Sequence, residues 1–240
     1  MSSATASPPV TAPPADAPSG PPRIGAGGGR PTFHRVAEAR IAWVPDRPLP
    51  FDEFLDLFGE DDDVELIDGV PVEKMAAQLD HEKLFVWLLT LLNYFVTDRD
   101  LGLVLGSRTA VEINDFRGRL PDLLFVRRDR MTIVEQKAVF GAPDLVVEFV
   151  SPGDRPSDVI ALETDYRAIG VAEVLFVDQG VQRVRALRRR EDGGYDESEQ
   201  SAGPLAFVTV AGFQIQTEWL WTDPRPAVRD VLAGLPGESR

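Results

Sequence analysis

Two segments of the chain, residues 81–97 and 157–169, have apolar residues at intervals of three and four, the spacing that gathers them on one side of an α-helix. We expect Asp80 to cap the first helix and Gly170 to end the second. Apolar runs of strand length lie around these helices, at residues 64–67, 70–75, 104–106, 109–113, 120–126, 144–150, 174–178, 181–187, 205–210 and 213–219. Strands interleaved with helices predict an α/β fold in which a mixed β-sheet is flanked by α-helices.

An Asp-Gly dipeptide at 68–69 separates two of the predicted strands and is typical of the tight turn of a β-hairpin. The first strand of this hairpin carries Glu65, on the same side as Ile67. Glu65 therefore either points inward with Ile67 or is a solvated acid in an acidic segment.

Two of the predicted strands carry an acid where a buried strand should have none. The run 120–126 contains Asp122, and the run 144–150 contains Glu148. An ionised carboxylate buried without a partner is very unfavourable, so it must be protonated or meet a cation. A shared divalent metal would relieve both acids, and ligation by oxygen alone favours Mg²⁺ or Mn²⁺ over Zn²⁺. The alternative is that both acids sit at strand ends and bond to backbone amides or to an arginine.

The composition is that of one globular domain with appended segments. The chain has 240 residues, no cysteine and only two histidines, which excludes disulfides and thiolate metal sites and argues against a histidine-rich zinc site. No apolar run is long enough to span a membrane and no signal pattern begins the chain, so we expect a cytoplasmic protein. The expected layout is a disordered Pro/Gly-rich tail at 1–32, a lead-in segment at 33–50, the main domain at 51–222 and a loose tail at 223–240.

The net charge of −14 argues against strong electrostatic binding of nucleic acid. The charge is uneven, because residues 51–80 hold eleven acids and one lysine, leaving −4 for the rest of the chain. A local basic face is therefore still allowed, and two groups of arginines could form one: Arg117, Arg119, Arg127, Arg128 and Arg130, and Arg183, Arg185, Arg188, Arg189 and Arg190. The simpler interpretation is that these arginines are only solvated surface.

Several short motifs, taken in order, resemble the Uma-two family of putative restriction endonucleases in the PD-(D/E)XK nuclease superfamily. They are Pro121-Asp122, Glu148 after a gap of 26 residues, Ser151-Pro152, the segment Glu65 to Gly69, the helix beginning near His81 and the helix containing Tyr166. The resemblance extends over residues 51–221. It implies a restriction-endonuclease-like fold, a central mixed sheet flanked by helices.

The resemblance also implies an activity, the metal-dependent hydrolysis of phosphodiester bonds in DNA. By this likeness Asp122 and Glu148 would be ligands of Mg²⁺ or Mn²⁺, helped by the carbonyl of Phe149. Glu65 would complete or support the site, and His81 would lie near it. A homodimer would suit the cleavage of both strands of a duplex.

One part of the family pattern is missing. In the superfamily a lysine usually lies two residues after the glutamate that corresponds to Glu148, and this chain has Val150 there. In the Uma-two branch the lysine instead lies four residues before the tyrosine that corresponds to Tyr166, and this chain has Leu162 there. The three lysines are Lys74, Lys83 and Lys137, of which we expect Lys83 or Lys137 to be able to reach the site from elsewhere. Arg155 is nearer in sequence, but a guanidinium stays protonated and could only position water or phosphate.

Three interpretations follow from this pattern. The first is a metal-dependent endonuclease whose lysine is displaced or dispensed with. The second is a catalytically degraded nuclease fold that acts by binding nucleic acid or protein. The third is an unrelated interaction domain, which the order of the motifs disfavours.

Overall fold

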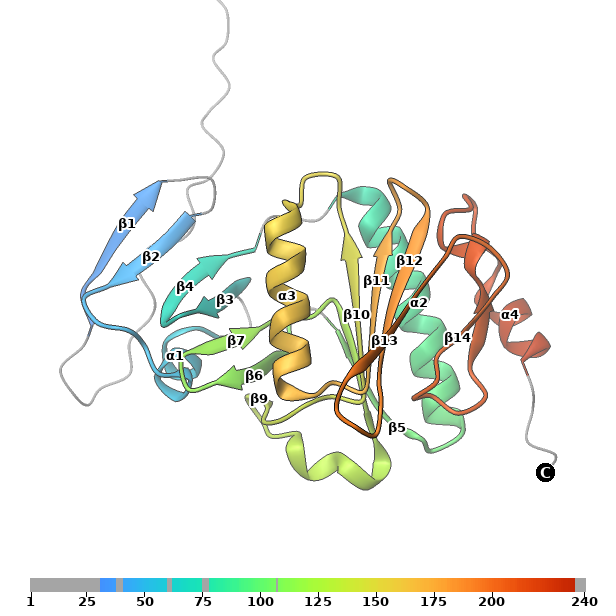
Figure 1. The fold of residues 1–240 in the computed structure, drawn as a ribbon, viewed down its shortest axis with the longest axis horizontal. Helices are drawn as coiled ribbons and strands as arrows, with labels where there is room; N and C mark the ends of the chain where they lie inside the picture. The colour runs from blue at the N-terminus through green and yellow to red at the C-terminus, as the bar shows by residue number, and fades with distance from the viewer. Residues whose placement is uncertain (1–30, 38–40, 60–61, 75–77, 107, 236–240) are drawn as a thin grey trace, which may run out of the picture.

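The computed structural model describes residues 31–37, 41–59, 62–74, 78–106 and 108–235, which build two large β-sheets and a small one (Figure 1). Residues 1–30 of the expected tail lie outside the described residues. In spatial order the first sheet contains β1 (Phe33–Ala37), β2 (Ile41–Pro45), β4 (Val70–Glu73), β3 (Val64–Ile67), β7 (Arg117–Arg119), β6 (Ala110–Asn114) and β9 (Ala138–Val139). The second contains β13 (Tyr195–Gln200), β12 (Arg183–Arg189), β11 (Glu173–Asp178), β10 (Leu145–Val150), β8 (Leu123–Arg127) and β5 (Gly102–Gly106). The third pairs β14 (Pro204–Ala206) with β15 (Gln214–Gln216).

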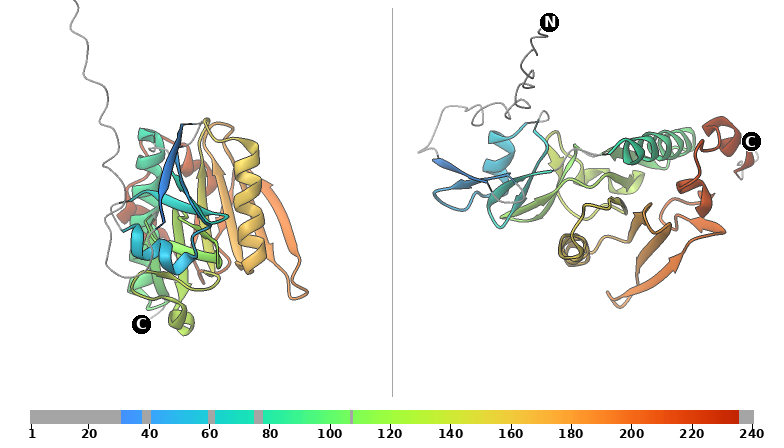
Figure 2. Two further views of the ribbon diagram at one scale, coloured as in Figure 1. Left: turned by 90° about the vertical axis from the view of Figure 1, so that its left-hand side faces the viewer. Right: turned by 90° about the horizontal axis from the view of Figure 1, so that it is seen from above.

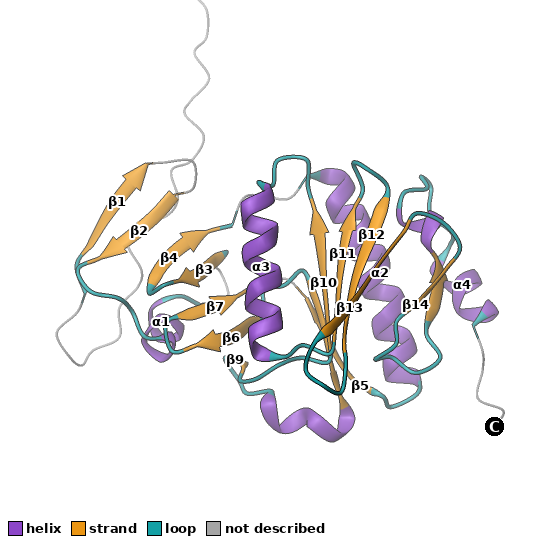
Figure 3. Ribbon diagram, viewed as in Figure 1, coloured by secondary structure: helices purple, strands orange, loops and turns teal. Residues whose placement is uncertain are grey.

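Helices cover the strands from outside, as Figure 3 shows. They are α1 (Phe51–Leu57), α2 (Leu79–Asp98), α3 (Pro156–Ile169) and α4 (Val228–Gly234), with short 3₁₀ turns at Arg128–Ile133 and Thr217–Leu220. The second sheet is mixed, because β10 and β11 are parallel whereas its other neighbouring strands are antiparallel. None of these helices is both long enough and apolar enough to cross a lipid bilayer.

The central strands of the second sheet, β8, β10 and β11, are buried on both faces, with α2 on one side and α3 on the other (Figure 2). Successive side chains of a strand point to opposite faces, so along β10 Val147 and Phe149 pack in the core with α2, whereas Val146 packs in the core with Tyr166 of α3. Glu148 therefore points toward α3. This arrangement explains why the strands read as continuous apolar runs.

The local predictions for the hairpin and for α3 are confirmed. Asp68 and Gly69 have φ angles of 51° and 76°, the positive pair that a type I′ turn requires. Helix α3 ends at Gly170, which is left-handed with φ 80°. The predicted cap of α2 is wrong, because the helix begins at Leu79 after Gln78 and Asp80 lies inside its first turn. A carboxylate there still faces the positive end of the helix dipole.

The two segments that flank the main domain are ordered where the structure describes them. The lead-in forms the hairpin β1–β2, which joins the first sheet through the pairing of Ala42 with Val72 of β4. Within 223–240, which we expect to be loose, α4 packs against α2: Val231 is buried in the same core, and Trp87 Nε1 donates to the carbonyl of Pro226 at 2.8 Å. Helix α4 thus covers part of the apolar surface of α2.

Candidate active site

Asp122 and Glu148 lie next to each other on neighbouring strands. The antiparallel register of β8 and β10 pairs Leu123 with Val147, and one further step places Asp122 opposite Glu148. Asp122 precedes β8 rather than lying within it, and its Oδ2 accepts a hydrogen bond from the amide of Phe149 at 2.8 Å. Each residue is only 5 % exposed. The structure thus brings together the two acids singled out in the sequence.

Glu148 is held from the α3 side of the sheet. The hydroxyl of Tyr166 donates a hydrogen bond to its Oε1. Burial, together with the charge of nearby Asp122, raises the pKa of Glu148 to about 8, and the charge of Lys74 and the Tyr166 bond offset only part of this rise. Without a metal, burial therefore favours the protonated form of the Glu148 carboxyl.

Lys74 is the lysine that reaches the site. It follows β4 directly, and its Nζ donates to the carbonyl of Leu120 at 2.7 Å and to Asp122 Oδ1 at 3.4 Å. Burial by itself would lower the pKa of Lys74, but the negative charges of Asp122, Glu148 and Glu65 outweigh burial and raise it. Lys74 is therefore a stable ammonium beside the two carboxyls.

The expectation that Lys83 or Lys137 reaches the site is wrong. Lys83 Nζ lies 3.3 Å from Asp223 on the outer side of α2, and Lys137 pairs with Asp56 at the surface. A signal for Lys74 was present in the sequence, since it ends the hairpin whose first strand carries Glu65.

Glu65 is buried, 6 % exposed, and both of its oxygens are engaged. Oε2 lies 2.9 Å from Nη1 of Arg119, and Oε1 accepts the amide of Leu120 at 3.1 Å. Of the two alternatives for Glu65, the inward one is confirmed. Its contacts fix the segment that leads into Asp122.

Arg119 and Arg117 connect the first sheet to α3 through Asp165. Arg119 Nε donates to Asp165 Oδ2 at 2.7 Å, and Arg117 Nη1 donates to the same oxygen at 3.0 Å. Burial would lower the pKa of Arg119, but the charges of Glu65 and Asp165 raise it. Because Asp165 precedes Tyr166, these ion pairs also hold the tyrosine that bonds Glu148.

His81, in the first turns of α2, lies at the site. Its ring meets that of Phe149 edge to face, with centroids 5.3 Å apart, and its Nε2 lies 3.8 Å from Asp122 Oδ1. Its Nδ1 is buried and has no hydrogen-bond partner among the described residues. Two cationic or potentially cationic groups, Lys74 and His81, thus approach the same oxygen of Asp122.

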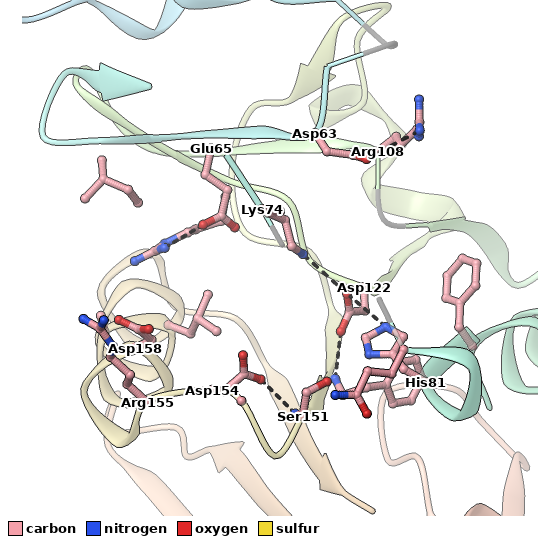
Figure 4. A pocket seen from close by; sticks show the side chains of 18 of the residues that line it. Asp63, Glu65, Lys74, His81, Arg108, Asp122, Ser151, Asp154, Arg155 and Asp158 are labelled. Carbon is pink, nitrogen blue, oxygen red and sulfur yellow. Dashed lines mark hydrogen bonds and ion pairs between the residues drawn. The ribbon is translucent and has the colours of Figure 1, made fainter. Parts of the chain in front are cut away.

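A cleft with a volume of about 820 Å³ opens beside Asp122, Lys74 and His81, which all line it (Figure 4). Six acidic and five basic side chains line it: Asp63, Glu65, Glu82, Asp122, Asp154 and Asp158, and Lys74, Arg108, Arg117, Arg119 and Arg155. Leu162 of α3 lines the same cleft, so an apolar side chain occupies the position where the family resemblance implies an amine. The nearly balanced charge distinguishes the cleft from a strongly basic groove.

The carboxylate oxygens of Asp122 and Glu148 fit Mg²⁺ or Mn²⁺ as a donor set. Within the described residues, no three His, Cys, Asp or Glu side chains form a ready metal-binding cluster. Mg²⁺ does not need such a cluster, because it keeps several waters and is commonly held by one or two carboxylates. Asp122 and Glu148 supply that pair, and in the metal-free protein Lys74 is the cation beside them.

Most of the arginines that could have formed a basic face are paired with acids. Arg127 pairs with Asp129 and Asp144, Arg128 with Asp100, Arg130 with Asp144, Arg183 with Glu199, Arg185 with Glu163, Arg188 with Glu173, and Arg190 with Asp192 and Asp196. Exposed pairs of this kind leave little net positive charge for phosphates.

Comparisons with known proteins agree with this description. Residues 51–218 match the Uma2 family, described as putative restriction endonuclease. The fold is similar to the crystal structure of a putative nuclease belonging to DUF820 from Anabaena variabilis ATCC 29413, with a TM-score of 0.61 and 18 % sequence identity over 72 % of this chain and 98 % of that chain. That likeness confirms the expected α/β fold. No curated protein matches the chain.

Proposed function

The chain belongs to the Uma2 family of putative restriction endonucleases, and we propose that it is a metal-dependent endonuclease that hydrolyses phosphodiester bonds in DNA. The observation that carries the proposal is the pair of buried acids, Asp122 and Glu148, brought side by side by two neighbouring strands next to a cleft that Asp122 lines. Acids in such positions are unfavourable for folding, which points to a function.

Asp122 and Glu148 would hold Mg²⁺ or Mn²⁺. A bound divalent cation supplies a water of lowered pKa and stabilises the negative charge that develops on the phosphate. Asp122 is oriented for this task by the amide of Phe149, which takes one of its oxygens, and Glu148 by the hydroxyl of Tyr166. Such supporting contacts fix the direction of ligand oxygens and are needed for tight metal binding.

Glu65 is proposed as a supporting residue rather than a ligand. Its two oxygens are taken by Arg119 and by the amide of Leu120, two residues before Asp122. Through these bonds Glu65 sets the path of the backbone that presents Asp122 to the cleft. This assignment follows the second of the two roles expected from the resemblance, support of the site rather than completion of it.

The charge around the cleft predicts how DNA binds. Because acids and bases are nearly balanced along its walls and most outlying arginines are paired, we expect weak DNA binding that falls steeply with salt. Cutting both strands of a duplex needs two active sites, and we propose that the protein acts as a homodimer for this purpose.

The test is cleavage of supercoiled plasmid by purified protein with Mg²⁺ or Mn²⁺. We expect wild-type protein to nick or linearise the plasmid, and Asp122→Asn and Glu148→Gln each to lower the rate by at least about 10²-fold. The matched control is Asp80→Asn, an exposed acid in the first turn of α2, which should cleave like wild type. Wild-type cleavage rates in either site variant would refute the assignment.

Leu162 favours a second candidate, a catalytically degraded nuclease fold that acts by binding. An apolar side chain at this position of the cleft is what loss of the catalytic amine would leave behind. That function predicts no cleavage by wild-type protein, together with binding of Mn²⁺ or DNA that Asp122→Asn abolishes.

A further inference from the structure

Only one oxygen of Asp122, Oδ1, faces the side chains of Lys74 and His81. Oδ2 is held by the amide of Phe149 at 2.8 Å, on the inner side of the strand pair. Oδ1 faces Lys74 Nζ at 3.4 Å and His81 Nε2 at 3.8 Å, as Figure 4 shows. The oxygen of Asp122 that faces the cleft is therefore the one that Lys74 now contacts.

Lys74 has a second anchor that does not depend on this contact. Its Nζ donates to the carbonyl of Leu120 at 2.7 Å, a shorter bond than the one to Asp122. An ammonium has three donors, so Lys74 can release Asp122 and still be held at the cleft by Leu120. Its side chain is only partly buried, which leaves room for this small movement.

Lys74 and Leu162 approach the cleft from different elements. Lys74 follows β4 in the first sheet, whereas Leu162 belongs to α3, which packs on the second sheet. Both residues line the same cleft, so an amine on the hairpin can reach the same space as an amine on α3. The other lysines are tied to surface acids, Lys83 to Asp223 and Lys137 to Asp56.

We propose that Lys74 is the amine of this active site and that it exchanges with the metal ion at Asp122 Oδ1. Without metal, the Lys74 ammonium neutralises Asp122 and occupies the cation position. With metal bound, Lys74 stays hydrogen-bonded to Leu120 and directs its remaining donors toward the attacking water or the phosphate. The proposal rests on the proposed nuclease function for its second half and on the geometry of the metal-free site for its first.

The first half is tested by Mn²⁺ titration of the full-length protein in the absence of DNA, by calorimetry. Lys74→Met removes the competing charge 3.4 Å from the ligand oxygen and should tighten Mn²⁺ binding about tenfold or more. Lys74→Arg keeps the charge and should bind Mn²⁺ within about threefold of wild type. The control Lys83→Met, at an exposed ion pair on α2, should leave affinity unchanged. Unchanged or weaker Mn²⁺ binding by Lys74→Met would overturn the exchange.

The second half is tested by plasmid cleavage at saturating Mn²⁺. Lys74→Met should bind the metal more tightly yet cleave about 10²-fold more slowly or worse, a combination that a merely structural residue would not produce. The double variant Lys74→Met/Leu162→Lys should cleave at least about tenfold faster than Lys74→Met alone, because the new amine enters the same cleft. A wild-type rate in Lys74→Met would overturn this role.

The two proposals fail in different ways. If wild-type protein and the Asp122→Asn variant cleave equally, the nuclease assignment fails. Tighter Mn²⁺ binding by Lys74→Met would still support the exchange at Asp122 in that case. If wild type cleaves and depends on Asp122, while Lys74→Met matches it in both rate and Mn²⁺ affinity, only the role of Lys74 fails.

Discussion

The buried carboxyl of Glu148 makes the metal-free protein sensitive to pH, and replacing it with an amide tests this directly. Glu148→Gln keeps the size of the side chain and an oxygen that accepts the Tyr166 hydroxyl bond, but it cannot ionise. Comparing the two proteins in the presence of a chelator therefore isolates the cost of ionising Glu148 in its buried position.

The sign and size of the effect follow from the pKa of Glu148. That pKa is about 8 in the folded protein, raised by burial and by Asp122 from its ordinary value of 4.5. Below pH 4.5 the carboxyl is protonated in both the folded and the unfolded chain. Between pH 4.5 and 8 only the unfolded chain releases the proton, so the free energy of unfolding decreases as pH rises, and above 8 the loss is complete. At about 1.4 kcal/mol per pKa unit the loss is about 5 kcal/mol at most.

Urea unfolding at pH 5 and pH 9 measures the difference. We expect Glu148→Gln and wild type to have similar free energies of unfolding at pH 5, and the variant to be more stable by several kcal/mol at pH 9. Glu191→Gln, in an exposed turn, serves as the control and should show the same small difference at both pH values. An equal difference at pH 5 and pH 9 for Glu148→Gln would contradict the reasoning. Saturating Mg²⁺ at pH 9 should stabilise wild type and leave Glu148→Gln unchanged.

Two further substitutions test the contacts that support the site. Asp165→Asn removes the charge that Arg119 meets in a buried ion pair, so urea unfolding should show a free energy of unfolding lower by about 3 kcal/mol. The control Glu199→Gln, at an exposed ion pair, should lower it by less than about 1 kcal/mol. Equal losses in the two variants would contradict the role given to burial. Tyr166→Phe removes the donor to Glu148 and should weaken Mn²⁺ binding about 10- to 100-fold in calorimetry, and unchanged affinity would show that this bond does not orient the ligand.

The parts of the fold that depend on local sequence could be predicted. Helix α3 follows from its apolar spacing and from Gly170, and the β3–β4 hairpin follows from the turn at 68–69, because neighbouring residues alone determine these features. The adjacency of Asp122 and Glu148 was expected from the acids in two predicted strands, and the pairing of β8 with β10 provides it. The predicted cap of α2 is wrong because the helix begins two residues earlier than expected, at Leu79 after Gln78, and helix ends are the least certain part of such a prediction.

The parts that depend on distant contacts could not be predicted. Arg119 looked like part of a basic face, yet it is 4 % exposed and its partners Glu65 and Asp165 lie 54 and 46 residues away in the chain. Lys74 meets Asp122 across 48 residues. The spacing of residues along α3 indicates that an amine is missing at Leu162, but it does not show which other part of the chain supplies an amine to the site.

The contact of Asp122 with the Phe149 amide is compatible with both interpretations of this acid. An acid at a strand end that bonds to a backbone amide was the alternative to a metal ligand, and the structure contains that bond. A carboxylate has two oxygens, however, and the amide takes only Oδ2. With Oδ2 fixed, Oδ1 is held toward Lys74 and the cleft. The backbone bond therefore directs the other oxygen toward Lys74, and this is the oxygen at which we propose that a metal ion exchanges with Lys74.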